Sequence, residues 1–416
     1  MANTGLALFT YCRPDHTRKV LESLKNNDFK KIYIFQDGLK NKKDEIAWKE
    51  VSDIIKDVDF IEKEVHISQI NRGLANSIIT GVNYVFEKHE TVIALEDDVV
   101  LSKGYSRFMD ACFEKYKNDE RITCVAGGGW PVDIPEAYGY DAFYSYRASS
   151  IAWGTWKNRW KHYNRDFGIM QRIMSDEEKK TILMKSGGDI TTIIKAQLFG
   201  ECDSWAVFWT LLQIDLKGVC VLPSIYLAKD VGHDGVFGTN STLRTIRYDA
   251  IASDLPDDKL LNLPDNVVIN EDINKQIKMI LDVTDRDNRK VVTERVLGKW
   301  VDMYLRGGSI ASYLTQNNIK QIYIYGAGVL AKKVINEIKN QIVIKGIIVL
   351  DKTIEEFYGY PVYGIQDDFE FENEYTVITP VHDLEYIRYI MKKRFDTEKL
   401  LSLEDIVGCD EQKMEG

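Results

Sequence analysis

The stretch TVIALEDDVVL, from Thr91 to Leu101, places three carboxylates between two apolar runs. The run from Val92 to Leu95 is typical of a buried strand, and Glu96, Asp97 and Asp98 follow it without a gap. Like charges at the end of a buried strand repel one another and lose solvation, so they are unfavourable unless a cation compensates them. The stretch therefore predicts a strand that carries a charged functional site at its end.

Strands and helices alternate on the amino-terminal side of this stretch. Apolar runs predict strands at 6–12, 31–38 and 64–70, and the segments between and after them predict helices at 13–26, 45–58 and 73–88. This alternation is typical of βαβ units and a mainly parallel sheet. Ligands of such sheets bind at the carboxyl ends of the strands. We therefore expect Thr10, Arg13, Asp37 and the carboxylates to lie at one edge.

Length and composition limit the number of domains and the possible classes of protein. A chain of 416 residues is too long for one ordinary core, so two or three domains are expected. The net charge of −10 argues against a non-specific nucleic-acid binder. Six scattered cysteines without a CxxC pair argue against a zinc ribbon or disulfide scaffold and suit a reducing cytoplasm. No apolar run is long enough to cross a membrane, and no signal-peptide pattern opens the chain.

A divalent cation is the expected partner of the three carboxylates. Mg²⁺ and Mn²⁺ prefer carboxylate oxygen and leave room for the phosphates of a substrate. The alternative is a solvated loop with local salt bridges. The apolar flanks and the parallel-sheet context favour the metal site.

Extended to ALEDDVVLSKGYSRFM (94–109), the stretch resembles the acidic metal-binding motif of nucleotide-sugar glycosyltransferases with the GT-A fold. It is especially similar to the N-acetylglucosaminyltransferase that initiates complex N-glycans and to related bacterial sugar transferases. ALFTYCRPDHTRKVLESL, IFQDG, NRGLANSI and SSIAWGTWKNRWKHY resemble further segments of that family, and the resemblance covers roughly residues 1–250. It implies metal-dependent, inverting transfer of a hexosyl or N-acetylhexosaminyl group from a nucleotide sugar, foremost a UDP-sugar.

The resemblance also implies roles for individual residues. Asp98 would coordinate the metal that bridges the donor diphosphate, Asp97 would lie against the ribose or sugar, and Glu96 would set the geometry of the motif. A metal here would stabilise the charge that develops on the leaving diphosphate. The other donor-binding residues implied at the strand ends are Thr10, Arg13, Asp37 and Arg72.

A general base that deprotonates the acceptor hydroxyl is expected in FGECDSWAVFWTLLQ (199–213). The resembling enzymes carry an acidic residue just before a Trp-bearing helix, and Asp203 matches it best, with Glu201 as the alternative. The structural alternative is that Asp203 only caps the helix. Asp230 and Asp234 are the next candidates for the base.

Two further segments are expected to line the cleft. In AWGTWKNRW (152–160), Trp153 would stack on a sugar ring, Gly154 would allow close backbone approach, and Trp160 would pack in the core. The polar loop KDVGHDGVFGTNST (229–242) would close over the diphosphate, with His233 as a further metal ligand.

The carboxyl-terminal part has a different character. We expect the GT-A domain at 1–255, a helical linker at 256–310 and a small Rossmann-like α/β domain at 311–416. Gly326, Gly328 and the later Asp351 form a partial dinucleotide-type fingerprint. This part resembles the amino-terminal domain of bacterial sugar O-acyltransferases, which implies a nucleotide-like turn. A packing or assembly module is the alternative.

The expected partners are a nucleotide-sugar donor and a glycan, lipid-linked glycan or glycoprotein acceptor, in bacterial polysaccharide or glycoprotein assembly. No nucleic acid is expected, whereas peripheral membrane association at the inner face and a homo-oligomer remain open. A sugar-phosphate nucleotidyltransferase is an alternative, but TYCRPDH lacks the Gly-rich loop of that class. The remaining alternatives are an oxidoreductase that acts through Gly326 and Gly328 and an inactive sugar-nucleotide-binding protein.

Overall fold

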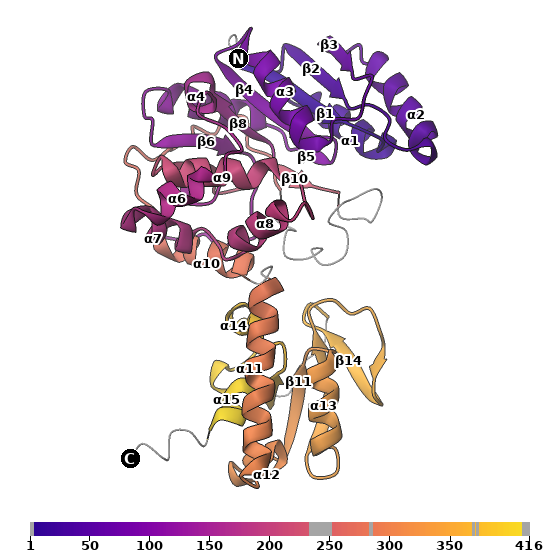
Figure 1. Ribbon diagram of the computed structural model, residues 1–416, viewed down its shortest axis with the longest axis vertical. Coiled ribbons are helices and arrows are strands. Elements are labelled where there is room, and N and C mark those ends of the chain that lie inside the picture. Colours follow the sequence, from indigo (N-terminus) through magenta and orange to yellow (C-terminus); the bar gives the residue numbers. More distant parts are fainter. Residues whose placement is uncertain (1–3, 233–251, 283–285, 368–370, 372–373, 410–416) are drawn as a thin grey trace. The chain divides into compact units, whose positions relative to one another are not determined.

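The computed structural model describes the chain except for residues 1–3, 233–251, 283–285, 368–370, 372–373 and 410–416 (Figure 1). It divides into two compact units, Met1–Lys278 and Met279–Gly416. The segment expected as a helical linker, 256–310, is shared between them. Both units are α/β, so the predicted α/β class with a second, small α/β domain is confirmed.

Unit 1 contains a large mixed sheet and a short two-stranded sheet. Its strands are β1 (Thr4–Thr10), β2 (Lys31–Gln36), β3 (Glu62–Ile67), β4 (Thr91–Glu96), β5 (Val99–Leu101), β6 (Ile122–Ala126), β7 (Ala142–Ser145), β8 (Trp153–Trp156), β9 (Val219–Pro223) and β10 (Ala228–Asp230). Its helices are α1 (Pro14–Leu24), η1 (Lys42–Asp44), α2 (Glu45–Lys56), α3 (Leu74–Phe86), α4 (Tyr105–Tyr116), α5 (Lys157–Trp160), α6 (Gly168–Met174), α7 (Glu177–Lys185), α8 (Asp189–Leu198), α9 (Trp205–Asp215) and α10 (Glu271–Asp282), the last of which extends past Lys278.

The sheet has eight strands in the order β3-β2-β1-β4-β8-β6-β9-β7. The first four are parallel, with Thr10 opposite Gln36 and Phe9 opposite Glu96. β8 is antiparallel to both β4 and β6. The carboxyl ends of β1, β2 and β4 therefore meet at one edge, as the alternation of strands and helices predicts.

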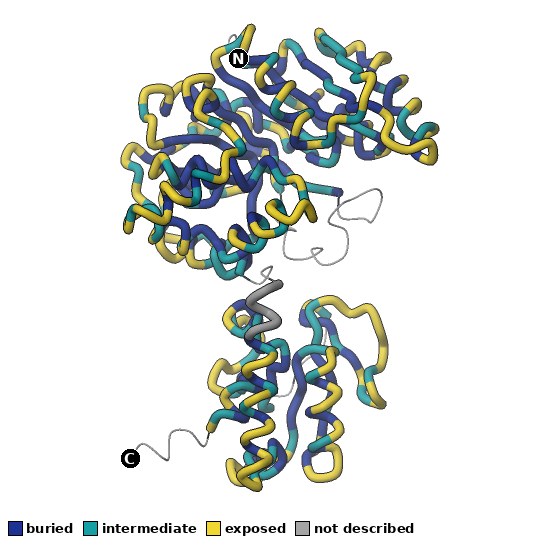
Figure 2. Tube along the Cα trace, viewed as in Figure 1, coloured by how far each residue is buried: buried dark blue, intermediate teal, exposed yellow. Residues whose placement is uncertain are grey.

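The alternation of side chains along β1 explains how helices cover both faces of the sheet. Leu6 and Leu8 pack with apolar residues of α1 and α2 in one buried cluster. Phe9 points to the other face, where Gly81 of α3 lies so close that a Cβ atom would be 2.5 Å from the Phe9 ring. Figure 2 shows the central strands of unit 1 as buried, with exposed positions on loops and outer helix surfaces.

A short ribbon extends from the edge where β4 ends. β5 pairs antiparallel with β10, so that Asp230 lies opposite Val99 and Ala228 opposite Leu101. The apolar residues after the carboxylates thus belong to a second, two-stranded sheet. This ribbon brings residues near 230 back to the acidic motif.

Unit 2 has a six-stranded sheet in the order β13-β14-β12-β11-β15-β16, parallel except for the β13–β14 pair. Its strands are β11 (Gln321–Tyr325), β12 (Val343–Val349), β13 (Glu356–Phe357), β14 (Tyr360–Gly364), β15 (Tyr375–Ile378) and β16 (Leu400–Ser402). Its helices are α11 (Arg286–Leu305), α12 (Ile310–Gln316), α13 (Val329–Ile338), η2 (Val381–Asp383), α14 (Leu384–Met391), η3 (Thr397–Lys399) and α15 (Leu403–Gly408). The strand order reverses between β11 and β15, which is where open α/β sheets bind ligands.

A buried ion pair fixes α8 to the sheet of unit 1. Arg147 donates from Nη1 and Nη2 to the carboxylate oxygens of Asp189 at 3.0 and 2.9 Å. Arg147 is 8% exposed and Asp189, in the first turn of α8, is 4% exposed. The pair matters to the site because Gln197, near the other end of α8, holds the segment that contains Asp203.

Arg147→Leu should lower the free energy of unfolding by about 3–5 kcal/mol, because it leaves the Asp189 carboxylate buried without its partner. The double variant Arg147→Leu, Asp189→Leu should recover most of that loss, since no buried charge remains. Denaturant melts of both variants measure the two values. A double variant no more stable than the single one would show that the pair is needed for more than charge compensation.

Candidate functional site

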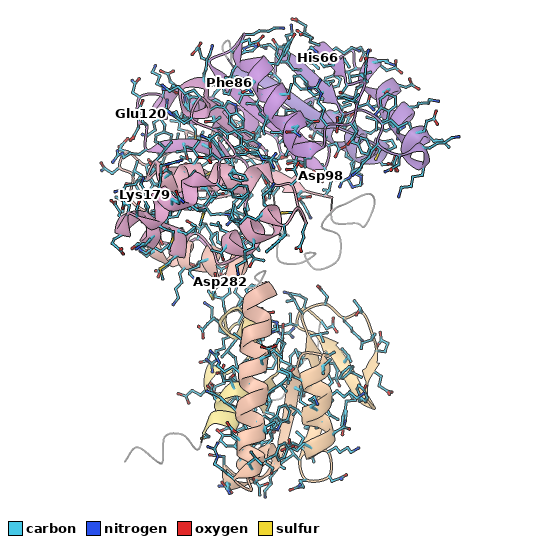
Figure 3. All side chains as sticks on the ribbon, viewed as in Figure 1. His66, Phe86, Asp98, Glu120, Lys179 and Asp282 are labelled. Carbon is cyan, nitrogen blue, oxygen red and sulfur yellow. The ribbon has the colours of Figure 1, made fainter. Side chains whose placement is uncertain are left out.

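Four carboxylates gather where β4 ends. Glu96 closes the strand, Asp97 and Asp98 form the turn to β5, and Asp230 closes the paired strand β10. The Val231 N–H donates to the Asp98 carbonyl at 2.8 Å, which holds the two segments together. Figure 3 labels Asp98 in unit 1. Sequence reasoning named Asp230 only as a substitute base, because the pairing of β5 with β10 is not visible in the sequence.

A glycine makes this approach possible. A Cβ atom on Gly232 would lie 2.1 Å from Asp98 Oδ2, so any side chain here would displace the carboxylate. The Gly232 N–H donates to Asp230 Oδ1 at 2.7 Å. The backbone at 231–232 therefore packs directly on the acidic motif.

Arg13 is the cation of the cluster. Its Nη1 donates to Asp98 Oδ2 and lies 3.6 Å from Asp97 Oδ1. Arg13 directly precedes α1, and the loop that holds it also supplies the Tyr11 N–H, which donates to Asp97 Oδ2 at 3.1 Å. The expected meeting of Arg13 with the carboxylates at one strand edge is therefore observed.

The carboxylates are held in an environment that disfavours their charge. Burial, and next the charge of Asp98, raise the pKa of Asp97 to about 7, against the opposing effect of Arg13. Burial and the charges of Asp98 and Asp230 raise the pKa of Glu96 well above its usual range. Burial and Asp230 likewise raise the pKa of Asp98. Within the described residues, Arg13 therefore offsets only part of the cost of holding these carboxylates together.

The donor set suits a hard divalent cation. Carboxylate oxygens are the ligands that Mg²⁺ and Mn²⁺ prefer, and a divalent charge would relieve the repulsion in the cluster. Within the described residues, however, no group of three or more His, Cys, Asp or Glu side chains is arranged so that it could hold a metal ion by itself. A cation here would need further ligands, and phosphate oxygens and water are those that Mg²⁺ usually retains. The expected ligand His233 lies outside the described residues.

Asp37 organises the loop before α3. Its Oδ1 accepts from the N–H groups of Gly38 and Arg72, and its Oδ2 accepts from Gly73 N–H, all at 2.9 Å. Arg72 is exposed, and its Nε lies 3.3 Å from Ser68 Oγ. The carboxylate of Asp37 therefore holds Arg72 at the strand-end edge.

Thr10 and Tyr11 form the end of β1. The Thr10 hydroxyl is buried and has no hydrogen-bond partner among the described residues, although the Thr10 carbonyl accepts from Asp37 N–H at 3.1 Å. The Tyr11 hydroxyl donates to Asp44 Oδ2 at 3.0 Å and accepts from Lys40 N–H at 3.0 Å. An unpaired buried hydroxyl is unfavourable, which makes Thr10 a candidate for ligand contact.

Asp203 lies at the start of α9 but does not cap it. The Ser204 hydroxyl is the cap and accepts from Val207 N–H at 3.3 Å. The side chain of Asp203 is 50% exposed, pairs with Arg165 and lies 3.4 Å from Gln197 Nε2. The structural alternative, a helix cap, therefore does not describe Asp203.

Asp203 also lies beside the amino terminus of α3. A Cβ atom on Gly73, which has φ +77°, would lie 4.0 Å from Asp203 Oδ2. The loop held by Asp37 thus reaches this carboxylate. Glu201 is exposed, and its N–H donates to the Ala196 carbonyl at 2.8 Å. Sequence reasoning missed Arg165, because nothing local marks it as the partner of Asp203.

Trp153 belongs to the core of unit 1. It is 1% exposed, and its ring centroid lies 4.8 Å from that of Trp205, 5.6 Å from Trp160 and 5.7 Å from Trp209. A Cβ atom on Gly154 would lie 2.6 Å from the Val92 carbonyl oxygen. The indole of Trp153 is covered by other indoles and is therefore not available for the expected stacking on a sugar, while Gly154 allows β8 to lie close to β4.

The glycine turn of unit 2 follows β11. Gly326 has φ +97°, and a Cβ atom there would lie 2.8 Å from Pro380 Cγ. Gly328 caps the amino terminus of α13 with no side-chain hydrogen bond, and space beside it is open. Asp351 is exposed just after β12. The turn lies where the strand order reverses, between β11 and β15.

The chain is remotely similar to several solved structures. No protein-family model and no curated protein matches the sequence. Among solved structures, S. aureus TarS has 12% identity and a TM-score of 0.27 over 39% of this chain and 30% of its own. S. aureus TarS 1–349 has 11% identity and a TM-score of 0.32 over 54% and 59% of the two chains.

A third solved structure is the mannosyltransferase PcManGT from Pyrobaculum calidifontis in complex with GDP-Man and Mn²⁺. It has 10% identity and a TM-score of 0.30 over 51% of this chain and 69% of its own. This chain thus matches less than two thirds of either TarS chain. Across the described residues, no helix has the length and apolar character needed to cross a bilayer.

The metal-free protein should gain stability as the pH falls from about 8 to about 5. The pKa of Asp97 is about 7 in the folded chain, above its unfolded value, so folding takes up a proton. The stabilisation is complete below the unfolded pKa and is lost as the pH rises through about 7. Thermal melts in a chelator should show this slope.

Asp97→Asn should reduce that slope and raise the melting temperature at the alkaline end, because the amide removes one buried charge. Asp53→Asn is the matched control, since it removes the same charge from an exposed position of α2. A variant with the wild-type pH profile would contradict the raised pKa of Asp97.

Proposed function

We propose that the protein is a glycosyltransferase that uses a nucleotide-sugar donor, foremost a UDP-sugar, with Mn²⁺ or Mg²⁺. The observation that carries this proposal is the cluster of Glu96, Asp97, Asp98 and Asp230 at the carboxyl edge of a parallel sheet. A nucleoside diphosphate and a divalent cation together match such a site, because each compensates the charge of the other. The sheet edge is also where α/β folds bind nucleotides.

Asp98 and Asp230 are the proposed ligands of the cation, with His233 as a further expectation. A bound cation would stabilise the charge that develops on the departing diphosphate. Arg13 already pairs with Asp98, so it is positioned to hold that carboxylate and to face a phosphate. Asp97 would accept from the ribose or the sugar, and Glu96 would fix the end of β4.

Three residues are proposed to hold the nucleoside. The buried hydroxyl of Thr10 lacks a partner in the described structure and can bond to a ligand at the strand edge. Asp37 keeps the loop 68–73 in place through the backbone N–H groups of Arg72 and Gly73, and the exposed side chain of Arg72 can reach a base or phosphate. The nucleoside would therefore lie across the ends of β1 and β2.

Asp203 is the proposed general base, with Glu201 as the alternative. Its half-exposed carboxylate can reach an acceptor hydroxyl, and direct displacement with such a base inverts the anomeric centre. Arg165 and Gln197 orient the carboxylate. The proposed acceptor is a glycan, a lipid-linked glycan or a glycoprotein, and the transferred group is a hexosyl or N-acetylhexosaminyl group.

For unit 2 we propose a nucleotide-like turn at Gly326 and Gly328, with Asp351 at the end of the next strand. A sugar-phosphate nucleotidyltransferase is the second candidate for unit 1, since it too would need acidic residues beside a nucleotide. The segment between β1 and α1 is only Tyr11–Arg13, which is too short for the phosphate-binding loop of that class.

Asp98→Asn should abolish Mn²⁺-dependent binding of UDP, because the amide retains the size of the side chain and loses the charge that binds the cation. Calorimetric titration of UDP with Mn²⁺ and with chelator measures this loss. Asp254→Asn, a substitution of an exposed carboxylate, is the control. Equal UDP affinity in wild type and Asp98→Asn would remove Asp98 from the metal site.

Asp203→Asn should lower turnover by a factor on the order of 10²–10⁴, the usual contribution of a positioned general base. UDP affinity should barely change, because the loss falls on the transition state. Glu201→Gln is the neighbouring control and should retain turnover. If Glu201→Gln is inactive and Asp203→Asn is active, the two roles are exchanged.

A further inference from the structure

Unit 1 carries an exposed basic and aliphatic surface at the carboxyl end of β2. We call it the basic rim and define it as Leu39, Lys40, Lys42, Lys43, Ile46 and Ile70. The rim combines the segment 39–46, which includes η1 and the first residues of α2, with Ile70 in the loop before α3. A Cβ atom on Gly38 would lie 2.2 Å from the Ile70 carbonyl carbon. The Asn71 amide also donates to the Gly38 carbonyl at 2.7 Å. The two segments of the rim therefore touch beside Gly38.

The lysines of the rim carry uncompensated charge. Lys40, Lys42 and Lys43 are exposed, and within the described residues none of them forms an ion pair. The acidic residues nearby are engaged: Asp44 is buried and accepts from Tyr11, and Glu45 pairs with Lys49 at 2.6 Å. A local positive surface on a chain with net charge −10 is a specific feature and does not follow from composition.

The aliphatic side chains of the rim point to solvent. Ile46 is 83% exposed, Ile70 is 66% exposed and Leu39 is 36% exposed. A soluble nucleotide phosphate would make no use of them. Lysines beside exposed aliphatic side chains match a lipid headgroup layer, in which the cations meet phosphates and the aliphatic groups enter the acyl boundary.

Charge along α2 gives the direction of docking. Its amino end, at the carboxyl edge of the sheet, follows Lys42 and Lys43, whereas exposed Asp53, Asp57 and Asp59 lie at or beyond its carboxyl end. An anionic surface would attract the first end and repel the second. The site edge would therefore face that surface.

We propose that the basic rim docks unit 1 on an anionic membrane, with the carboxyl edge of the sheet toward the lipid. The phosphates that the lysines would bind belong to the lipid headgroups of a bilayer. A free phosphate would make no contact with the exposed isoleucines. The proposal concerns a surface and stands apart from the transfer reaction. It would place the candidate site beside an acceptor carried by a lipid.

Co-sedimentation of the full chain with vesicles tests the proposal. The wild-type protein should bind vesicles of phosphatidylcholine that contain about one third phosphatidylglycerol, and high salt should abolish this binding. It should not bind vesicles of pure phosphatidylcholine. Lys42→Ser with Lys43→Ser should weaken binding by about 5-fold per lysine. Ile46→Ser should weaken binding while the salt dependence stays as in wild type, because only the aliphatic contact is lost.

Lys332→Ser with Lys333→Ser is the matched control, because it removes the same charge from exposed positions of α13 in unit 2 and should leave vesicle binding unchanged. Equal binding to neutral vesicles, no binding at all, or an equal defect in this control would overturn the proposal. Vesicle binding that survives Lys42→Ser with Lys43→Ser while UDP affinity falls would assign the loop to the donor site instead. None of these outcomes depends on transferase activity.

Discussion

The burial of neighbouring carboxylates beside the guanidinium of Arg13 is the constraint on which unit 1 depends. Burial and mutual repulsion raise the pKa values of Glu96, Asp97 and Asp98, and Arg13 offsets only part of that cost. A fold that served stability alone would replace such a cluster by apolar side chains. The raised pKa values support the proposal that the cluster binds a cation together with a ligand.

The surrounding architecture serves to hold that cluster in place. The parallel strands bring the ends of β1 and β4 together, the short pair of β5 and β10 returns Asp230 to the motif, and Gly232 leaves room for Asp98. Asp37 holds the loop before α3 by two backbone N–H groups, those of Arg72 and Gly73. That loop reaches Asp203 through Gly73, so the carboxylate at the start of α9 is linked to the strand-end edge.

The two units differ in the number of structural features that suggest a ligand site. Unit 1 combines charge, raised pKa values and an unpaired hydroxyl at one edge, all of which are unfavourable without a ligand. In unit 2 the glycine turn lies where the strand order reverses, and the same turn also allows Gly326 to lie against Pro380. Close packing against Pro380 and Thr379 already requires a glycine at position 326, whether or not the turn binds a ligand.

The sequence by itself determined the α/β class, the strands β1 to β4 and the meeting of Arg13 with the carboxylates at one edge. The spacing of apolar residues and the alternation of strands with helices are visible in the local sequence. The carboxyl ends of neighbouring parallel strands lie at the same edge of the sheet. Only the tertiary structure decided that Asp230 joins the cluster, that Arg165 pairs with Asp203 and that Trp153 is buried. Each of these depends on contacts between residues distant in sequence or on burial, and neither is encoded in local spacing. The local sequence around a tryptophan such as Trp153 is the same whether its ring contacts a sugar or three other indoles.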